Sequence, residues 1–358
     1  VGAWSDRLRT PIGRRMPFIL IGAPIGAVAF GLIPLAAVLP LFVACTSSLL
    51  LSMAVWRTPV VALMPDITPS PLRSQANGII NLMGGLGAIV ATLGGSQLYK
   101  INVAYPFWLG SVLVVVASLL VFAFIREPKE VAAVEKSPGL LASLREVLND
   151  TDQSALRLLL AIFFWFLGYT AIEAFFSLYA VNHLGLAAAD GVRLLGQLSL
   201  IFVLFALPSG YIGARIGRRV TIVIGIVILG SMMLGMFLLP VATLTTSLFY
   251  VPVLQDVPVA GLMLMAAGAG WALININSLP MVVDMTDTAR IGTYTGLYYL
   301  FSTLSAIAGP NVNGWLIQLT GNNYNLVMIV APMFMAVALI LMLGVRRGEA
   351  RPSAVTAG

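Results

Sequence analysis

The chain has 358 residues, of which 59% are hydrophobic and only 9% charged, with a formal net charge of +6. A soluble domain carries about 25% charged residues, so this composition excludes a protein that folds in water alone. The cations flank apolar stretches instead of gathering on one face, which argues against a nucleic-acid-binding protein. The single Cys45 excludes an internal disulfide, and the single His183 makes a histidine metal site implausible.

Ten apolar stretches are long enough to cross a membrane, since a spanning helix needs about 20 mainly apolar residues. We therefore expect an all-α integral membrane protein. The predicted spans, in chain order, are residues 17–37, 41–65, 77–98, 106–125, 156–181, 191–213, 220–240, 258–283, 292–318 and 324–345.

The distribution of positive charge predicts the orientation of these spans. If the spans alternate across the membrane and residues 1–16 are cytoplasmic, 17 of the 20 Lys and Arg lie on the cytoplasmic side. Lys100 and Arg193 then lie outside, and Arg57 lies within a span. This asymmetry follows the positive-inside rule. It favours a multi-pass protein of the plasma (inner) membrane whose C-terminus is cytoplasmic.

One long polar segment, residues 126–155, divides the spans into two groups. We expect it to be a cytoplasmic linker between an N-terminal bundle (1–125) and a C-terminal bundle (156–345), with a cytoplasmic tail at 346–358. Within the linker, the pattern of Leu140–Leu148 predicts a short amphipathic helix on the membrane surface.

Two basic loops repeat at matching places in the two groups. Gly13-Arg14-Arg15 and Gly217-Arg218-Arg219 each lead into a span, which suggests a duplicated membrane transporter. Asp66 and Asp284 each close a span, and each is followed by a glycine 12 residues later. Four spans precede the linker and six follow it. If the halves are homologous, two further helices are expected before the first residue of this chain.

These residues resemble a known family. The pattern Gly2, Asp6-Arg7 and Gly13-Arg14-Arg15 resembles the loop signature between helices 2 and 3 of the major facilitator superfamily. Further stretches resemble one branch of this superfamily, the glycoside–pentoside–hexuronide and sucrose–proton symporters. They are the insertion Leu8–Ile12, Met16–Leu20, Ala62–Asp66, and Gly270-Trp271-Ala272 to Gly296. The resemblance implies a major facilitator fold of twelve helices, of which the ten spans would be helices 3 to 12.

The resemblance also implies a gate. Asp6, Arg7, Arg14 and Arg15 would form a charge relay at the cytoplasmic seam between the halves and stabilise an outward-open state. Cationic loops of this kind can pair with acids such as Asp66 or Asp284, and helix N-termini attract carboxylates. The alternative is a basic cluster that faces anionic lipid and sets the topology.

Glu173 is the most informative intramembrane residue. An ionised carboxylate in hydrocarbon is costly, so an acid within a span usually faces a cavity and carries function. Trp165, Tyr169 and Glu173 are spaced i, i+4 and i+8, and therefore lie on one helix face. Aromatic rings with a single acid suit a sugar or a similar solute. The alternative is that Glu173 lies near the outer water boundary and holds a neighbouring helix.

The other candidates lie in five further spans. Arg57 cannot lose its proton, so it predicts a bound anion or a gating ion pair, unless its side chain extends to the cytoplasmic surface. Trp271 and Asn275 share a face of one span with Ser278, as ligand contacts or as helix-packing groups. Weaker candidates are Asn81, Gln197, Tyr298 and Ser302.

The sequence contains no metal cluster, catalytic triad or nucleotide motif, so we expect no enzyme and no cofactor. We expect proton-coupled symport of a small polar solute, a sugar, by alternating access between the two bundles. Two alternatives remain open. One is proton-driven efflux of an amphipathic compound from an aromatic, Met-rich pocket, for which the 15 methionines are a reason. The other is a membrane protein that does not transport.

Overall fold

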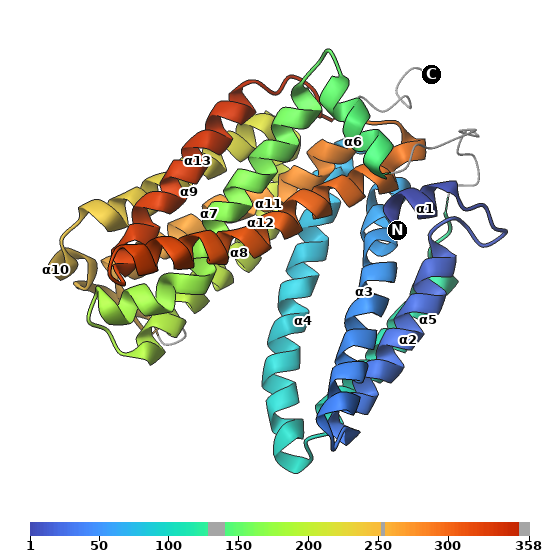
Figure 1. The fold of residues 1–358 in the computed structure, drawn as a ribbon, viewed down its shortest axis with the longest axis horizontal. Helices are drawn as coiled ribbons and strands as arrows, with labels where there is room; N and C mark the ends of the chain where they lie inside the picture. The colour runs from blue at the N-terminus through green and yellow to red at the C-terminus, as the bar shows by residue number, and fades with distance from the viewer. Residues whose placement is uncertain (128–139, 252–254, 351–358) are drawn as a thin grey trace. The chain divides into compact units, whose positions relative to one another are not determined.

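The computed structural model describes residues 1–127, 140–251 and 255–350, and within them the chain is almost entirely helical (Figure 1). Each predicted span coincides with one long helix, so the predicted all-α membrane fold is confirmed. These helices are α2 (Met16–Leu32), α3 (Leu39–Ile67), α4 (Arg73–Ile101), α5 (Tyr105–Phe124), α7 (Ser154–Asn182), α8 (Ala188–Ile216), α9 (Arg218–Leu238), α11 (Val259–Val283), α12 (Ile291–Leu319) and α13 (Val327–Leu343). In the described part of the chain, eight helices are long and apolar enough to cross a membrane.

Shorter elements join the long helices. They are α1 (Gly2–Arg7), α6 (Leu140–Asn149), α10 (Val241–Leu244), the strands β1 (Ser247–Val251) and β2 (Gln255–Pro258), and single 3₁₀ turns at Ile33–Leu35, Ser70–Leu72, Thr288–Arg290 and Tyr324–Leu326. Helix α6 confirms the helix predicted at Leu140–Leu148.

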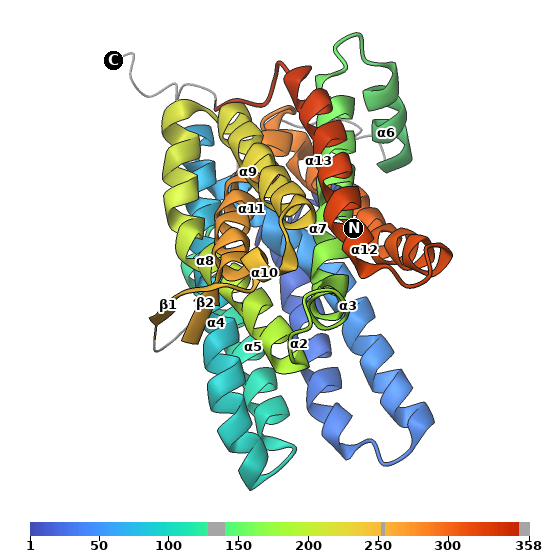
Figure 2. The same ribbon diagram turned by 90° about the vertical axis from the view of Figure 1, so that its left-hand side faces the viewer.

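Two of these elements differ from the sequence-based expectation. Residues 2–7 were expected within a loop but form α1, whose Ser5 and Asp6 side chains are buried in polar contacts. Strands β1 and β2 form an antiparallel hairpin that leads directly into α11 (Figure 2). The aromatic and β-branched residues of β1 favour a strand, but the strand is too short to stand out beside two apolar spans.

The described chain forms two compact units, each built from three separate stretches of the sequence. Unit 1 contains Val1–Pro69, Met83–Glu146 and Thr286–Gly296, and unit 2 contains Ser70–Leu82, Val147–Met285 and Leu297–Gly358. Helices α4 and α12 therefore each contribute to both units.

Within unit 1, α2 packs against α3 and α5. Met16, Ile19 and Leu63 form a small buried core in this contact. Gly22 lets α2 approach α3 closely, because a Cβ there would lie 2.8 Å from the Trp56 side chain.

Within unit 2, α11 lies at the centre and packs against α8 and α9, while α13 packs against α7 and α9. A Cβ added to Gly225 of α9 would lie 2.5 Å from the carbonyl oxygen of Gly270 in α11. Small residues at such positions allow membrane helices to approach closely, which positions α11 against its neighbours.

Candidate functional site

Four aromatic rings from three helices of unit 2 lie together. Tyr169 of α7 and Trp271 of α11 stack face to face, with ring centroids 3.8 Å apart and an interplanar angle of 6°. Phe166 contacts Trp271 edge to face at 5.1 Å, and Tyr298 of α12 contacts Phe166 at 6.3 Å. Such pairs contribute about 0.5–1.5 kcal/mol each beyond their burial. We call these four residues the aromatic wall.

Polar groups adjoin the aromatic wall. The Tyr169 hydroxyl donates to Glu173 Oε1 at 3.4 Å, one helical turn further along α7. Ser278 Oγ lies 3.3 Å from the Tyr298 hydroxyl and donates to the Asn275 carbonyl oxygen at 2.9 Å. Glu173 is exposed and Phe166 is half-buried, whereas the other three rings are buried. Glu173 and Phe166 are therefore the most exposed groups of this arrangement.

The structure thus brings together Tyr169, Glu173 and Trp271, which the sequence favoured, and two further candidates, Tyr298 and Ser278. Asn275 lies one turn from Trp271 and is half-buried. Trp165 is fully buried, and its neighbour Phe166 makes the ring contact with Trp271. Phe166 was not predicted from the sequence, although its spacing of i, i+3 and i+7 to Tyr169 and Glu173 places it on the same face.

Arg57 lies on an exposed side of α3 in unit 1. The preceding residue, Trp56, packs against Gly22 of α2. Arg57 and Glu173 belong to different units, so the pairing of these charges across a cavity stays a prediction.

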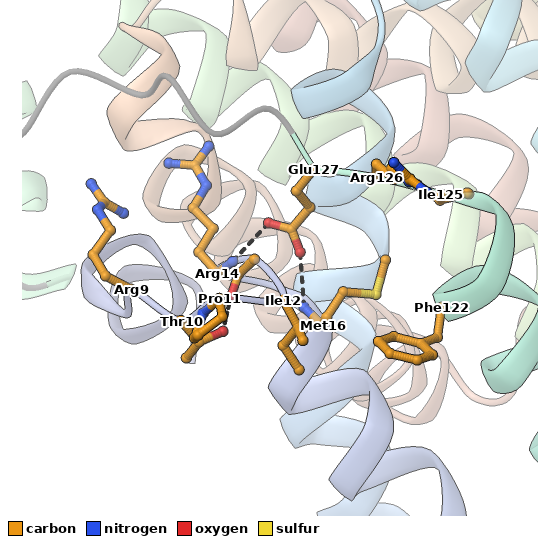
Figure 3. Close-up of a pocket in the computed structure, with 11 residues that line it drawn as sticks. Arg9, Thr10, Pro11, Ile12, Arg14, Met16, Phe122, Ile125, Arg126 and Glu127 are labelled. Carbon is orange, nitrogen blue, oxygen red and sulfur yellow. Dashed lines mark hydrogen bonds between the residues drawn. The ribbon is translucent and has the colours of Figure 1, made fainter.

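Glu127 holds the start of α2 in unit 1. Its carboxylate accepts hydrogen bonds from the backbone N–H groups of Arg14 at 2.8 Å, Arg15 at 2.9 Å and Met16 at 2.9 Å (Figure 3). The first N–H groups of a helix lack partners within the helix, and the helix dipole attracts negative charge to this end. Glu127 therefore fixes the direction in which the two arginine side chains leave the helix.

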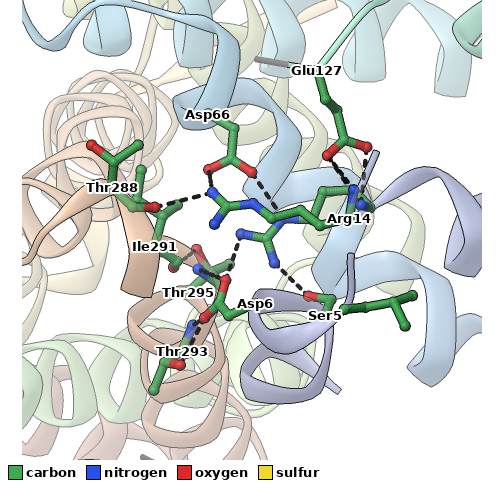
Figure 4. Close-up of polar contacts among 12 residues, drawn as sticks. Ser5, Asp6, Arg14, Asp66, Glu127, Thr288, Ile291, Thr293 and Thr295 are labelled. Atoms are coloured by element: carbon green, nitrogen blue, oxygen red, sulfur yellow. Dashed lines mark hydrogen bonds and ion pairs between the residues drawn. The ribbon is translucent and has the colours of Figure 1, made fainter. Parts of the chain in front are cut away.

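Buried ion pairs extend from these arginines (Figure 4). Asp66, at the end of α3, accepts from Arg14 Nη2 at 2.7 Å and from Arg15 Nε at 2.8 Å. Arg15 Nη2 lies 2.7 Å from Asp6 Oδ1, and none of these four side chains is more than 5% exposed. We call Asp6, Arg14, Arg15, Asp66 and Glu127 charge cluster 1.

Asp6 also binds the start of α12. Its carboxylate accepts from the backbone N–H groups of Gly292 at 3.0 Å and Thr293 at 2.6 Å, and from Thr293 Oγ1 at 2.7 Å. Arg14 Nη2 donates to the Thr288 carbonyl oxygen at 3.0 Å in the preceding turn. Charge cluster 1 thus joins the ends of α1, α2, α3 and α12.

Arg15 keeps its charge despite being buried. Burial alone would lower the pKa of its guanidinium, but the carboxylates of Asp66 and Asp6 outweigh this effect and raise the pKa above its ordinary value. Arg15 and the two carboxylates therefore stabilise each other, because a buried charge of either sign without a counter-ion would be costly.

A second cluster lies at the matching place in unit 2. Asp284, at the end of α11, pairs with Arg218 and with Arg73, the first residue of α4. Ser70 Oγ donates to Asp284 Oδ2 at 2.6 Å. Glu349 accepts from the backbone N–H groups of Arg218 at 2.8 Å and Arg219 at 2.9 Å. We call Arg73, Arg218, Arg219, Asp284 and Glu349 charge cluster 2.

The predicted gating residues therefore divide between two clusters. Asp6, Arg14, Arg15 and Asp66 lie in charge cluster 1, and Asp284 lies in charge cluster 2. The side chain of Arg7 lies outside the described residues. Glu127 and Glu349 were not predicted from the sequence, although each lies one or two residues after an arginine that follows the last span of its half.

In the part of the chain that the structure describes, no group of three or more His, Cys, Asp or Glu is placed to hold a metal ion. The chemistry that these sites offer is recognition by aromatic rings, hydrogen bonding by one carboxylate, and charge pairing at helix ends.

Helices that cross a membrane, an aromatic wall beside an acid, and duplicated charge clusters define a helical solute transporter. The chain matches the family model of the Major Facilitator Superfamily over residues 1–310 and belongs to this family. No curated protein sequence matches it significantly.

Solved structures show the same fold. The fucose:proton symporter FucP of E. coli has a TM-score of 0.76 at 14% identity, covering 97% of this chain and 86% of that chain. The human organic anion transporter MFSD10 has a TM-score of 0.72 at 20% identity, covering 96% and 79%. The proton:xylose symporter XylE has a TM-score of 0.69 at 14% identity, covering 97% and 83%. At these identities the likeness concerns the fold alone.

Proposed function

We propose that this protein is a secondary transporter that carries a sugar together with a proton by alternating access. The observation that supports this proposal best is the aromatic wall with Glu173 beside it. Aromatic faces bind the apolar faces of sugars, and a carboxylate accepts hydrogen bonds from their hydroxyl groups. Two proteins with a similar fold, FucP and XylE, are sugar:proton symporters.

In this proposal, Glu173 carries the proton and the aromatic wall holds the solute. A protonated Glu173 is neutral, which removes most of the cost of enclosing it in a site that water has left. The Tyr169 hydroxyl orients the carboxyl group, and Trp271 fixes the Tyr169 ring by stacking. Trp165 and Asn275 would support the pocket, and Arg57 would be the electrostatic counterpart of Glu173.

The charge clusters would act as the gate in the same cycle. They hold the starts of α4 and α12, the two helices that contribute to both units. The excess of Lys and Arg on one side of the spans supports placing both clusters, the linker and the C-terminus at the cytoplasmic face of the plasma membrane.

Proton-driven efflux of an amphipathic compound remains the rival function, because four aromatic rings would suit such a compound as well. The methionines support it less than their number suggests. Eight of the 15 are buried: Met16, Met64, Met233, Met236, Met281, Met328, Met335 and Met342. Buried methionines of this kind fill packing gaps.

The test is uptake of radiolabelled disaccharides into proteoliposomes that contain the full protein, with an imposed pH gradient. We expect the gradient to drive uptake, and Glu173→Gln to abolish this accumulation. Sugar counterflow without a gradient should persist in Glu173→Gln if the residue carries only the proton. Tyr169→Phe, which keeps the ring, should reduce accumulation less.

Asp190→Asn serves as the matched control, because Asp190 is an acid outside the aromatic wall that pairs with Arg193 at 3.0 Å. This variant should transport like the wild type. Accumulation that survives in Glu173→Gln would move the coupling site elsewhere. A wild-type protein that takes up none of the sugars would favour efflux or a protein that does not transport.

A further inference from the structure

A cavity of about 540 Å³ lies in unit 1 where α2 begins and α5 ends, beside charge cluster 1 (Figure 3). Its lining has two chemically distinct parts. One part consists of arginine side chains, and the other consists of apolar side chains of the spans and of the loop before α2.

Two exposed arginines of this cavity, Arg9 and Arg126, have no carboxylate within ion-pair distance among the described residues. Arg9 Nη1 donates to the carbonyl oxygens of Asp6 at 3.0 Å and Leu8 at 3.3 Å, which leaves most of its donors available. Arg14 lines the same cavity with a side chain 5% exposed, and its Nη1 has no hydrogen-bond partner in the described chain.

One carboxylate, that of Glu127, also lines the cavity. It would oppose a bound anion, but it already accepts three backbone N–H groups at the start of α2. The positive end of the helix dipole offsets its charge further. The cavity therefore retains an excess of positive charge.

The apolar lining lies at the end of a span. Ile12 and Phe122 are exposed, Ile125 is half-buried, and Met16 is buried beneath them. Helix α5 ends at Phe124, and the basic residue Arg126 follows two positions later. A change from apolar to cationic side chains over so few residues marks the level of lipid headgroups in a bilayer.

The wall formed by Arg9, Thr10, Pro11 and Ile12 belongs to an insertion that the second basic loop lacks. Five residues separate Arg7 from Gly13, whereas Ile216 alone separates Arg215 from Gly217. The insertion therefore adds a cation and an apolar side chain that the repeated loop motif does not need.

We propose that this cavity binds the headgroup of an anionic phospholipid. The anionic headgroup would lie against the arginine part of the lining, and the acyl chains would run along Phe122 and Ile125. Guanidinium groups pair well with phosphate oxygens. Inorganic phosphate would satisfy the arginines but would leave the apolar lining without a partner. The site is separate from the aromatic wall and does not depend on which solute is carried.

The test is native mass spectrometry of the full protein in detergent, titrated with phosphatidylglycerol or with phosphatidylcholine of the same chain length. We expect preferential binding of phosphatidylglycerol. Arg126→Gln and Arg9→Gln should each weaken this binding about tenfold, because each removes a positive charge of the lining that attracts the headgroup. Both side chains are exposed, so both variants should fold, which size-exclusion chromatography checks.

Arg215→Gln is the matched control, since Arg215 is an exposed arginine in the last turn of α8 and lies outside the cavity lining. It should bind phosphatidylglycerol like the wild type. Equal affinity for both lipids, or equal losses in all three variants, would overturn the proposal. Displacement of the lipid by millimolar inorganic phosphate would also overturn it and would assign the cavity to a soluble phosphate.

Discussion

Charge clusters 1 and 2 arise from the same local sequence but form different networks. In each cluster, an arginine after a glycine pairs with the aspartate that ends a span, Asp66 or Asp284. In each, a glutamate accepts hydrogen bonds from the first backbone N–H groups of the helix that the arginines begin. The repeated sequence therefore specifies the ion pair and the helix cap.

The difference lies in what completes each network. Charge cluster 1 has Asp6, which binds Arg15 and the start of α12. In the second half, Ala214 stands before Arg215 where the first half has Asp6 before Arg7. The Arg73 side chain of α4 joins Asp284 instead. Arg290 lies just before α12, at the position that corresponds to Arg73 at the start of α4. It binds Glu146 of α6 instead of an aspartate, with its two terminal nitrogens at 2.9 and 2.8 Å from the carboxylate oxygens.

Charge cluster 2 has one carboxylate fewer and one arginine more than charge cluster 1, so the two clusters differ in their balance of charge. Charge cluster 1 contains three carboxylates and two guanidinium groups, whereas charge cluster 2 contains two carboxylates and three guanidinium groups. The excess carboxylate of charge cluster 1 is stabilised by helix N-termini. Charge cluster 1 therefore depends on backbone N–H groups of α12, while charge cluster 2 depends on a side chain of α4.

The largest effect is expected from Asp66→Asn. The substitution leaves two buried guanidinium groups, those of Arg14 and Arg15, without their shared counter-ion. Breaking a buried ion pair from one side costs about 3–5 kcal/mol, so the protein should unfold at a clearly lower temperature in detergent. Asp284→Asn should cost about as much, because the Arg218 side chain, which is 1% exposed, loses its carboxylate partner in the same way. Wild-type stability in either variant would contradict this expectation.

Asp6→Ala should have the next largest effect, because it makes charge cluster 1 resemble charge cluster 2. The substitution leaves Arg15 paired with one carboxylate only, that of Asp66. It also leaves two backbone N–H groups of α12 unpaired. Together these losses should lower the free energy of unfolding by about 2–3 kcal/mol. Ala214→Asp, at an exposed position, should change the free energy of unfolding by less than about 0.5 kcal/mol. Denaturant unfolding of both variants measures the two changes in the free energy of unfolding. A larger loss of stability in Ala214→Asp than in Asp6→Ala would reject the proposed role of Asp6.

A smaller effect is expected from the helix-capping glutamates. Glu127→Gln and Glu349→Gln keep the shape of the side chain but remove the charge that the helix dipole stabilises. Losses at such caps are about 0.5–2 kcal/mol. Glu127→Gln should cost more, because Glu127 is half-buried and Glu349 is exposed. Hydrogen exchange of the first turns of α2 and α9 would show the difference directly, and equal exchange in both variants would contradict it.

Much of the fold could be predicted from the sequence, since the bilayer imposes a length and a polarity on each span. The predicted ends differ from those of the helices by a few residues; the span expected at 106–125, for example, is α5, Tyr105–Phe124. The pairing of β1 with β2 could not be predicted in this way, because each strand is only a few residues long.

The site could be predicted only in part. The spacing along α7 places Tyr169 and Glu173 together, but the stacking of Tyr169 on Trp271 depends on the packing of α7 against α11. Asp6 and Thr293 are 287 residues apart in the chain, so nothing local indicates that they bind each other. Residue types therefore show which groups need partners, and the tertiary fold decides which partners they receive.

The smallest effect is expected at the junction of α6 and α7, where the ion pairs are exposed. Arg347 binds Asp150 and Asp152 at 2.7 Å each. The hydrogen bond from Arg347 lowers the pKa of Asp150 below its ordinary value of 3.8, and hydrogen bonds from Ser154 lower the pKa of Asp152. A carboxyl with a lowered pKa stabilises the fold above its unfolded pKa and loses this effect as the pH falls through its folded pKa.

Contacts of Arg347 should therefore be unchanged between pH 8 and pH 5 and should be lost only below pH 3.8. Hydrogen exchange of residues 150–155, measured as a function of pH after correction for intrinsic rates, would show this as a late increase. Asp150→Asn should reduce the increase, because one titrating carboxyl is removed. A loss that begins near pH 5 would show that the pKa values are not lowered. In contrast to the buried clusters, salt should weaken this junction, since exposed ion pairs are screened.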